Sequence, residues 1–395
     1  MTNIAATRYL TSSRVDLSSV FMPLSFGGQY SETGYKLSSG ADLNTLFCKN
    51  YTNVPANKTS LLLSDGQDLS DVFEKRHTVG YSNSAPISTI ARALYPLNST
   101  TTYVAGDFPY GIVRWDGSST TFAILSASQL NPTFGGAQIR TTYAVDLSNV
   151  YVGGQFATAN GNSIPYITKW NGTSFVAVDN NLLNATVNVM YELDLSNVYV
   201  GGTFTNRIKI LNTYTDTFTD LSVVGLNSGV RVIHAFDISN VFIGGDFTNG
   251  GNIGSFVTRW NGTQFNRLGD FDLSGGLVIA MHALDPEHVY IGGSFTKYGS
   301  NTNMNRVAMW DGTNIIALST GISAGDVRAI YALDENHVYM GGTFNHIKMW
   351  NGSSFNTLSG GIAFPLTTAP ALSMLKNNKT SLIIGGSNGV IRWAT

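Results

Sequence analysis

Short apolar stretches alternate with polar, glycine-rich turns along most of the chain, and one such unit recurs seven times. Each copy is an apolar run that ends in a glycine pair, Ala-Gly in the first copy, and usually continues with one residue and Phe. The copies are spaced 43 to 49 residues apart. A period of this size, made only of strand-like segments, is typical of β-propeller blades. The copies begin at Tyr103, Tyr151, Tyr199, Phe242, Tyr290, Tyr339 and Ile383.

A second motif, Trp-(Asn/Asp)-Gly-(Ser/Thr), follows most of these units and predicts a hairpin with a type I′ turn. An inner strand, the glycine strand, the Trp strand and an outer strand bearing Phe then make four strands per repeat. We expect the Trp and the Phe to fill the wedge between adjacent blades. The third repeat has Leu211 instead of Trp, which predicts a less well packed blade. The motif occurs at Trp115, Trp170, Trp260, Trp310 and Trp350.

The pattern therefore predicts an all-β fold, a seven-bladed β-propeller with four-stranded blades, over residues 77–395. The last repeat reaches Trp393 without an outer strand. We expect residues 77–84 to supply that strand by pairing with residues 389–393, because closure by the two chain ends removes an exposed sheet edge.

Residues 1–76 hold a different repeat, Asp-Leu-x-x-(Val/Leu)-Phe, in three copies 26 residues apart that start at Asp16, Asp42 and Asp68. Asp before an apolar turn is typical of a helix N-cap. One copy is too small to bury its own apolar side, so we expect a segment that docks onto a larger assembly; a small self-packed cap is the alternative. The predicted docking residues are Leu17, Phe21, Leu43, Phe47, Leu69 and Phe73.

Composition narrows the function. The net charge is −2 and only 12% of residues are charged, which argues against nucleic acid or an anionic lipid surface as partner. No stretch is long and apolar enough to insert into a membrane. Cys48 is the only cysteine, so no internal disulfide forms. The first residues lack a basic stretch before an apolar one, so we expect no secretory signal.

The blade unit resembles the propeller repeats of fungal cortical-marker proteins and is similar to kelch repeats, with Phe175, Phe265 and Phe355 where the kelch Trp stands. This resemblance covers about residues 85–395 and implies the fold alone. The tandem Asp-Leu-x-x-(Val/Leu)-Phe unit resembles short repeats in virion proteins of large DNA viruses and phages. That second resemblance implies a virion location; otherwise we expect a soluble cytoplasmic or extracellular protein.

The candidate ligand site is the mouth of the central channel. Alignment of the inner strands on their Ala-Leu pair predicts one row made of Arg92, Tyr143, Tyr191, His234, His282 and Tyr331. Three residues earlier, Arg140, Arg231 and Arg328 form a second row. Such a ring is suited to a polar or anionic ligand; alternatively, one row packs between blades or lines a water-filled channel. His234 and His282 lack a third ligand at this register, so we expect no metal and no cofactor.

Aspartates recur just after the inner strands and predict Asx turns rather than catalytic acids. They are Asp146, Asp194, Asp237, Asp285 and Asp334.

The sequence thus favours a non-enzymatic structural or adhesion protein, and we expect protein partners such as capsid proteins. Long polar loops at 157–164, 248–254 and 296–305 suit protein or glycan contact. A lectin-like propeller that uses Tyr166 and Tyr298 is one alternative. A propeller glycosidase or lyase is another, although the inner strands offer only Glu192 as an acid, where such enzymes need a pair.

Overall fold

The chain divides into two units, Met1–Arg76 and His77–Thr395, and all described residues belong to the second. The predicted docking repeats lie outside them. The computed structural model describes residues 79–82, 90–98, 100–115, 122–125, 130–131, 138–159, 161–221, 225–302, 304–344, 347–357, 371–374, 381–386 and 389–394.

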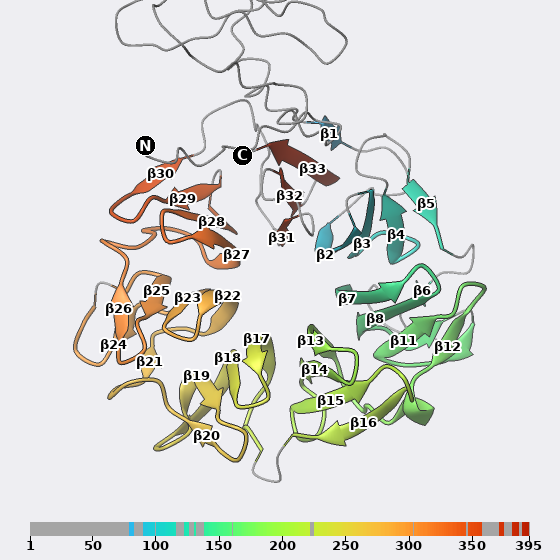
Figure 1. Cartoon of the computed structure of the whole chain (residues 1–395), viewed down its shortest axis with the longest axis horizontal. Helices are drawn as coiled ribbons and strands as arrows, with labels where there is room; N and C mark the ends of the chain where they lie inside the picture. The colour runs from blue at the N-terminus through green and yellow to red at the C-terminus, as the bar shows by residue number, and fades with distance from the viewer. Residues whose placement is uncertain are drawn as a thin grey trace, which may run out of the picture. The chain divides into compact units, whose positions relative to one another are not determined.

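The second unit is a β-propeller in which antiparallel sheets of four strands are arranged around a common centre (Figure 1). Six blades are each built from one continuous stretch, with the first strand innermost and the fourth outermost. Each blade takes the name of its innermost strand. The first three blades consist of β2 Ala91–Asn98, β3 Thr101–Gly106, β4 Ile112–Trp115 and β5 Phe122–Ile124; β7 Gln138–Asp146, β8 Asn149–Gln155, β11 Ile167–Trp170 and β12 Phe175–Ala177; and β13 Val187–Asp194, β14 Asn197–Gly202, β15 Ile208–Asn212 and β16 Thr217–Asp220.

The next three contiguous blades repeat this order. They consist of β17 Val230–Asp237, β18 Asn240–Gly250, β19 Gly254–Trp260 and β20 Phe265–Asn266; β22 Val278–Asp285, β23 His288–Gly293, β25 Val307–Trp310 and β26 Ile315–Ala317; and β27 Val327–Asp334, β28 His337–Gly342, β29 Lys348–Trp350 and β30 Phe355–Thr357.

A seventh four-stranded sheet combines both ends of the described chain and closes the ring. It contains β31 Ala371–Met374, β32 Ser381–Gly386 and β33 Gly389–Ala394, with β1 Val79–Ser82 as its outer strand. β1 pairs antiparallel with β33, from Val79 opposite Arg392 to Ser82 opposite Gly389. The predicted pairing of residues 77–84 with 389–393 is confirmed, and β1 supplies the strand that the last repeat lacks.

The glycine pairs create the contact between successive blades. A Cβ on Gly244, the first glycine of its pair, would lie 2.4 Å from Cγ1 of Val278 on the next blade. The same glycine on the β7 blade would meet Val187 of the β13 blade at 2.6 Å. The second glycine faces backbone instead: a Cβ on Gly293 would lie 1.9 Å from the Leu277 carbonyl oxygen. No side chain fits either space, so the sequence repeats glycine there.

The tryptophans lie buried between blades, as predicted. Trp170 is 8% exposed and sits opposite Phe175 across its hairpin, with the two ring centroids 5.3 Å apart. Its core cluster also contains Tyr103 of the preceding blade. Trp260 shares a cluster with Tyr199 of the blade before it in the same way. Each wedge is therefore filled from both sides.

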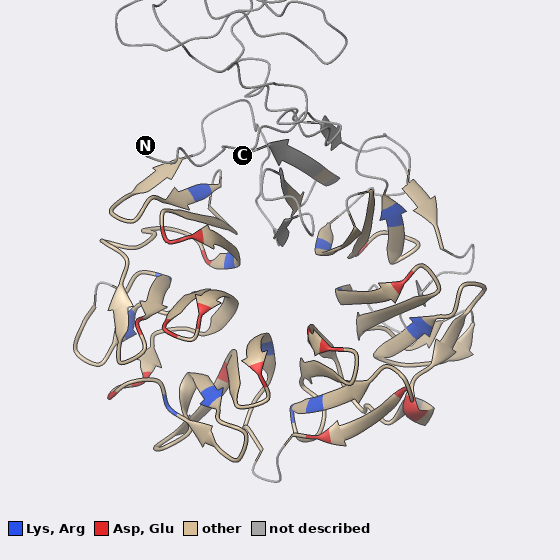
Figure 2. Ribbon diagram, viewed as in Figure 1, with Lys and Arg blue, Asp and Glu red and all other residues tan. Residues whose placement is uncertain are grey.

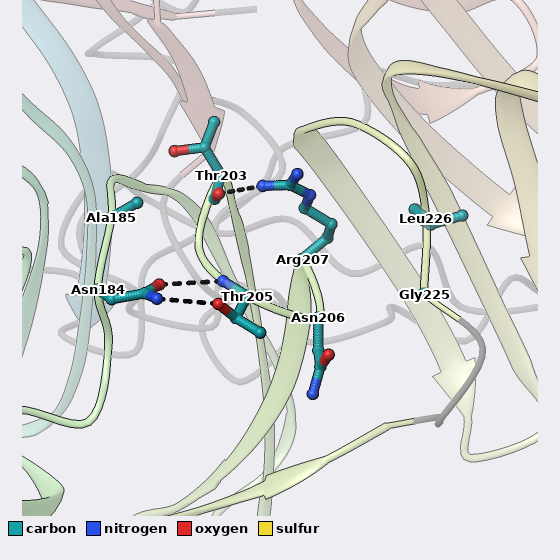
Figure 3. Close-up of a pocket in the computed structure, with 8 residues that line it drawn as sticks. All are labelled: Asn184, Ala185, Thr203, Thr205, Asn206, Arg207, Gly225 and Leu226. Atoms are coloured by element: carbon teal, nitrogen blue, oxygen red, sulfur yellow. Dashed lines mark hydrogen bonds between the residues drawn. The ribbon is translucent and has the colours of Figure 1, made fainter.

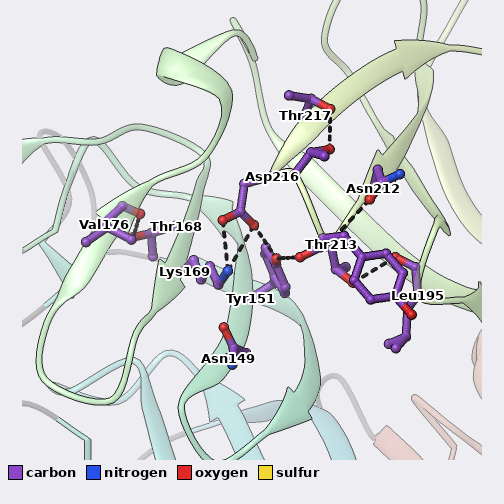
Figure 4. A network of polar contacts seen from close by, with 12 residues as sticks. Asn149, Tyr151, Thr168, Lys169, Val176, Leu195, Asn212, Thr213, Asp216 and Thr217 are labelled. Atoms are coloured by element: carbon purple, nitrogen blue, oxygen red, sulfur yellow. Dashed lines mark hydrogen bonds and ion pairs between the residues drawn. The ribbon is translucent and has the colours of Figure 1, made fainter.

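The β13 blade buries the residue that replaces Trp. Leu211, in the Trp position, is completely buried, and the hairpin that follows reaches the preceding blade (Figure 4). There, the Asp216 carboxylate accepts hydrogen bonds from the Tyr151 hydroxyl and from Lys169 Nζ, the latter at 2.8 Å. A polar clamp between blades thus accompanies the loss of the indole.

The turns are Asx-stabilised, as predicted, but the type I′ assignment is wrong. Asp146 Oδ1 accepts from the backbone N–H of Ser148 at 2.7 Å and from Asn149 Nδ2 at 3.0 Å. In the Trp-Asn-Gly turn only Gly172 has a positive φ, of 94°. Asn171 keeps a negative φ because its Oδ1 accepts from the backbone N–H groups of the two residues beyond the glycine.

Two of the three long polar loops contain short additional strands, and the third extends a hairpin. The loop at 157–164 forms β9 Thr158–Ala159 and β10 Asn162–Ser163, and β9 also pairs with β6 Leu130–Asn131. In the loop at 296–305, β24 Lys297–Tyr298 pairs with β21 Leu273–Ser274. The loop at 248–254 is an extension of the β18–β19 hairpin. A short 3₁₀ turn, η3 Asp179–Asn181, follows β12.

Candidate functional site

The alternating strand directions give the propeller two different faces. At the turn face lie the Asp turns and the Trp turns. At the opposite face, called here the loop face, the innermost strands begin, the glycine pairs end, and the three long loops emerge. A site for a partner is therefore best sought at the loop face, where sequence and length vary from blade to blade.

A β-bulge near the start of each of the six innermost strands β2, β7, β13, β17, β22 and β27 places one extra residue at the loop-face end of the strand. On β2, Ala91 pairs with Gly106 and Ala93 with Ala105, so Arg92 is the extra residue. Arg140 on β7 and Arg231 on β17 are the extra residues at the same position. In the described chain this bulge row contains Arg92, Arg140, Asn188, Arg231, Ile279 and Arg328.

The predicted rows were therefore misaligned on the first blade. Arg92 belongs with Arg140, Arg231 and Arg328, whereas Tyr95 joins the row of tyrosines and histidines. Tyr95 pairs with Tyr103 just as Tyr143 pairs with Tyr151. Basic positions are visible on the innermost strands β2, β17 and β27 in Figure 2.

Two of the four arginines in the bulge row form bidentate ion pairs within their own blade. Arg92 donates from Nε and Nη2 to the two carboxylate oxygens of Asp107, at 2.6 and 2.5 Å. Arg231 makes the equivalent fork with Asp246, with Nη2 to Oδ2 at 2.9 Å. Both aspartates occupy the residue just after the glycine pair. An aspartate directly after the glycine pair is therefore the sequence signal for such an ion pair.

Arg140 lacks such a partner, because the residue after its glycine pair is Gln155. Its Nη1 donates to Asn188 Oδ1 at 2.7 Å and its Nη2 to Gln138 Oε1 at 2.9 Å. Burial lowers the pKa of Arg140, and the positive charges of Arg231 and Arg92 lower it further. Asn188 also donates to the Val230 carbonyl oxygen of the next blade at 2.7 Å.

Arg328 is also incompletely paired. Its Nη2 lies 3.5 Å from Asp326 Oδ2, and its Nε is buried without a hydrogen-bond partner among the described residues. The residue after its glycine pair, Thr343, instead accepts a hydrogen bond from the backbone N–H of Asp326 at 2.7 Å.

The tyrosine and histidine row packs between blades, which is the alternative that the sequence left open. Ring centroids are 4.9 Å apart for Tyr191 and His234, 5.3 Å for His234 and His282, and 4.5 Å for His282 and Tyr331. Burial lowers the pKa of His234 to about 3 and that of His282 to about 4. Both rings are therefore neutral at physiological pH and act as packing groups.

Glu192 accepts a hydrogen bond from the Tyr95 hydroxyl at 2.9 Å, across the intervening β7 blade. Burial and the nearby Glu192 carboxylate raise the pKa of Tyr95. Among the described residues, no three His, Cys, Asp or Glu side chains gather as metal ligands would. The described part of the chain also contains no helix long and apolar enough to cross a membrane.

A pocket of about 400 Å³ opens between the β13 and β17 blades on the loop face (Figure 3). Asn184 crosses its edge to Thr205, donating from Nδ2 to the hydroxyl at 2.9 Å and accepting from the backbone N–H at 3.0 Å. Arg207 donates to the Thr203 carbonyl oxygen. The lining is mainly amide, hydroxyl and backbone groups whose hydrogen bonds are largely satisfied internally.

The aromatic residues proposed for a lectin have structural positions. Tyr298 is 7% exposed, and its hydroxyl accepts from the backbone N–H groups of Asp270 and Phe271 at 3.1 and 3.4 Å. Tyr166 packs partly against the core cluster that contains Tyr151. Tyr298 is thus unavailable for stacking on a sugar, because its ring belongs to the blade interior.

Comparisons place the chain by its fold. No protein-family model matches the sequence, and no curated protein matches it. Among solved structures it is similar to U3-55K (13% identity, TM-score 0.56, covering 78% of this chain and 96% of that one). It is also similar to the WD40 β-propeller domain of Doa1 (12%, 0.55, 81% and 96%) and to YCF48 bound to a D1 peptide (10%, 0.54, 80% and 97%). At these identities the likeness establishes a β-propeller fold alone.

Proposed function

We propose that this chain is a non-enzymatic interaction protein that binds a protein partner on the loop face of its propeller. The observation that carries this proposal is the asymmetry of the two faces. The turn face closes on itself through Asx hydrogen bonds, whereas the loop face combines ordered loops, a pocket and incompletely neutralised arginines. Rigid, loop-bearing surfaces of this kind suit recognition of another macromolecule.

The channel chemistry supports a binding role over catalysis. The histidines are neutral and packed, the recurring aspartates are held in turns, and Glu192 is engaged by Tyr95. The fold neighbours are also in keeping with a binding module, since the YCF48 structure is of a complex with a peptide.

We further propose that residues 1–76 attach the propeller to a larger assembly, such as a virion. The support is the threefold Asp-Leu-x-x-(Val/Leu)-Phe repeat, whose apolar pairs Leu17 and Phe21, Leu43 and Phe47, and Leu69 and Phe73 recur at a fixed spacing. Replacing the three phenylalanines with Ser in the full chain should abolish incorporation into the assembly, measured by proteomics of purified particles. Unchanged incorporation would contradict this attachment role.

Site-specific photo-cross-linking tests which face binds the partner. A photoreactive amino acid is placed at Asn162, exposed on the loop face, or at Leu147, 49% exposed on the turn face. Cross-linking in the source cells should give a discrete protein adduct from position 162 and none from position 147. Adducts from 147 alone, or from neither position, would overturn the proposal.

A further inference from the structure

The bulge row at the loop-face end of the innermost strands contains one guanidinium for which the described part of its blade provides no carboxylate. On the β2 and β17 blades, the residue after the glycine pair is an aspartate. Its two carboxylate oxygens accept hydrogen bonds from two nitrogens of the arginine. On the β7 blade this residue is Gln155, which is exposed. On the β27 blade this residue is Thr343, but Arg328 there has Asp326 within 3.5 Å. Arg140 is therefore the arginine of the row without a carboxylate partner among the described residues.

Arg140 is nevertheless held in place. Asn188 Oδ1 and Gln138 Oε1 accept from its two terminal nitrogens at 2.7 and 2.9 Å. Asn188 is in turn anchored to the Val230 carbonyl oxygen. These neutral oxygens orient the planar guanidinium without neutralising it. In the described part of the chain only two of its five N–H donors have partners.

The charged groups around Arg140 also leave a net positive charge. Arg92 and Arg231 lie near enough for their charges to act on Arg140, and Asp107 and Asp246 offset them. Together with Arg140 itself these groups comprise three positive and two negative charges, a net positive charge of one. A guanidinium that is oriented but not neutralised favours a planar anion that accepts two parallel hydrogen bonds.

We propose that Arg140 is a recognition site for an Asp or Glu side chain of the partner protein, which completes at the β7 blade the ion pair that Asp107 and Asp246 complete at theirs. This inference rests on the proposed function and names the chemistry of the partner segment. A carboxylate is chosen because the two sister forks in this molecule are each filled by one.

The test uses the full chain and fluorescein-labelled hexaglutamate, with hexaglutamine as the uncharged peptide, by fluorescence anisotropy. Hexaglutamate should bind, more weakly as salt is added, and hexaglutamine should not. Arg140→Gln should weaken binding at least about tenfold, since a charged hydrogen-bonded pair is lost. Arg114→Gln removes the same charge from an exposed position on β4 and should change affinity less than about twofold.

A second variant keeps the test decisive if Arg140→Gln fails to fold. Gln155→Asp recreates the residue pair of the sister blades, so its carboxylate should occupy Arg140 and weaken hexaglutamate binding at least about tenfold while the melting temperature is maintained. Gln155→Asn is the uncharged control and should bind like the parent chain. Equal binding by Gln155→Asp and Gln155→Asn would overturn the proposal.

Competition identifies the anion. Inorganic phosphate or a single-stranded RNA oligonucleotide that displaces hexaglutamate at lower concentrations than free glutamate would overturn the choice of carboxylate. If hexaglutamate fails to bind while position 162 still cross-links to a protein partner, this inference falls and the proposed function stands. If neither occurs, both fall.

Discussion

At the scale of single residues, the repeat is maintained by positions where only one side chain is compatible. On the β7, β13, β17 and β22 blades the first glycine of the pair accommodates a valine methyl group of the next blade. The Trp of the β17 blade fills the wedge beside it. The positions proposed to bind a partner are those whose residue type varies from blade to blade. The bulge row changes from Arg to Asn to Ile around the ring, because its members are the extra residues that pair with no partner in the sheet register.

Gly244→Ala tests the contact between blades. The new methyl carbon would lie 2.4 Å from Val278 Cγ1 and 2.7 Å from Val232 Cγ1, so the blades must separate or the valines must leave their rotamers. We expect a loss of about 1–3 kcal/mol in unfolding free energy, measured by urea denaturation. Gly225→Ala, where a Cβ meets nothing within 4 Å, is the matched control and should be nearly neutral. Equal effects of the two substitutions would contradict the account.

Acid should destabilise the propeller through His234. Its pKa is lowered to about 3 in the folded protein, so the unfolded chain binds the proton first as the pH falls below about 6.5. Stability should therefore be highest above pH 6.5 and decline toward pH 3, by up to about 1.4 kcal/mol per pH unit from this group. His234→Gln should reduce that slope in thermal unfolding measured across this range. A slope identical to that of the parent chain would refute the assignment.

At the scale of elements, the strands and their order were predictable because hydrophobic alternation and turn motifs repeat with the blade. The register of Arg92 was not predictable. The Ala93-Leu94 pair mimics the Ala-Leu pair that follows His282 or Tyr331, but it falls three residues earlier in its strand. The true equivalent, Tyr95, is followed by proline. Only the pairing of Tyr95 with Tyr103 resolves the alignment.

The contact at Asp216 was also invisible in the sequence. The Leu211 substitution signals a departure from the repeat, but the partners Tyr151 and Lys169 lie 65 and 47 residues away. The Asp216 contact, which accompanies the loss of the Trp, depends on residues of a neighbouring blade, and no local sequence pattern indicates them. The same holds for Asn188, whose partners come from the blades on either side.

The hydrogen bond between Tyr151 and Asp216 should couple two neighbouring blades energetically. Tyr151→Phe, Asp216→Asn and the double variant form a thermodynamic cycle in which the interaction energy is isolated. We expect a coupling of about 1 kcal/mol or more in unfolding free energy, because the tyrosine is buried and the acceptor is charged. Strict additivity of the two single changes would show that the clamp does not stabilise the blade contact.

At the scale of the whole propeller, stability depends on the closing sheet. A chain beginning at residue 77 keeps β1, whereas one beginning at residue 84 lacks it and leaves β33 as an open edge. We expect the shorter chain to lose about 2–4 kcal/mol, since several backbone hydrogen bonds disappear, and to self-associate through the edge. Chemical denaturation and light scattering measure the two effects. Equal stability of both chains would mean that closure does not depend on β1.

β1, the strand that closes the ring, comes directly after residues 1–76, the segment proposed to attach the protein to its assembly. Among the described four-stranded sheets, the one that receives this strand is also the one not made from contiguous chain. A load applied through residues 1–76 would therefore enter the propeller at its seam, where four residues of β1 are held by β33 alone.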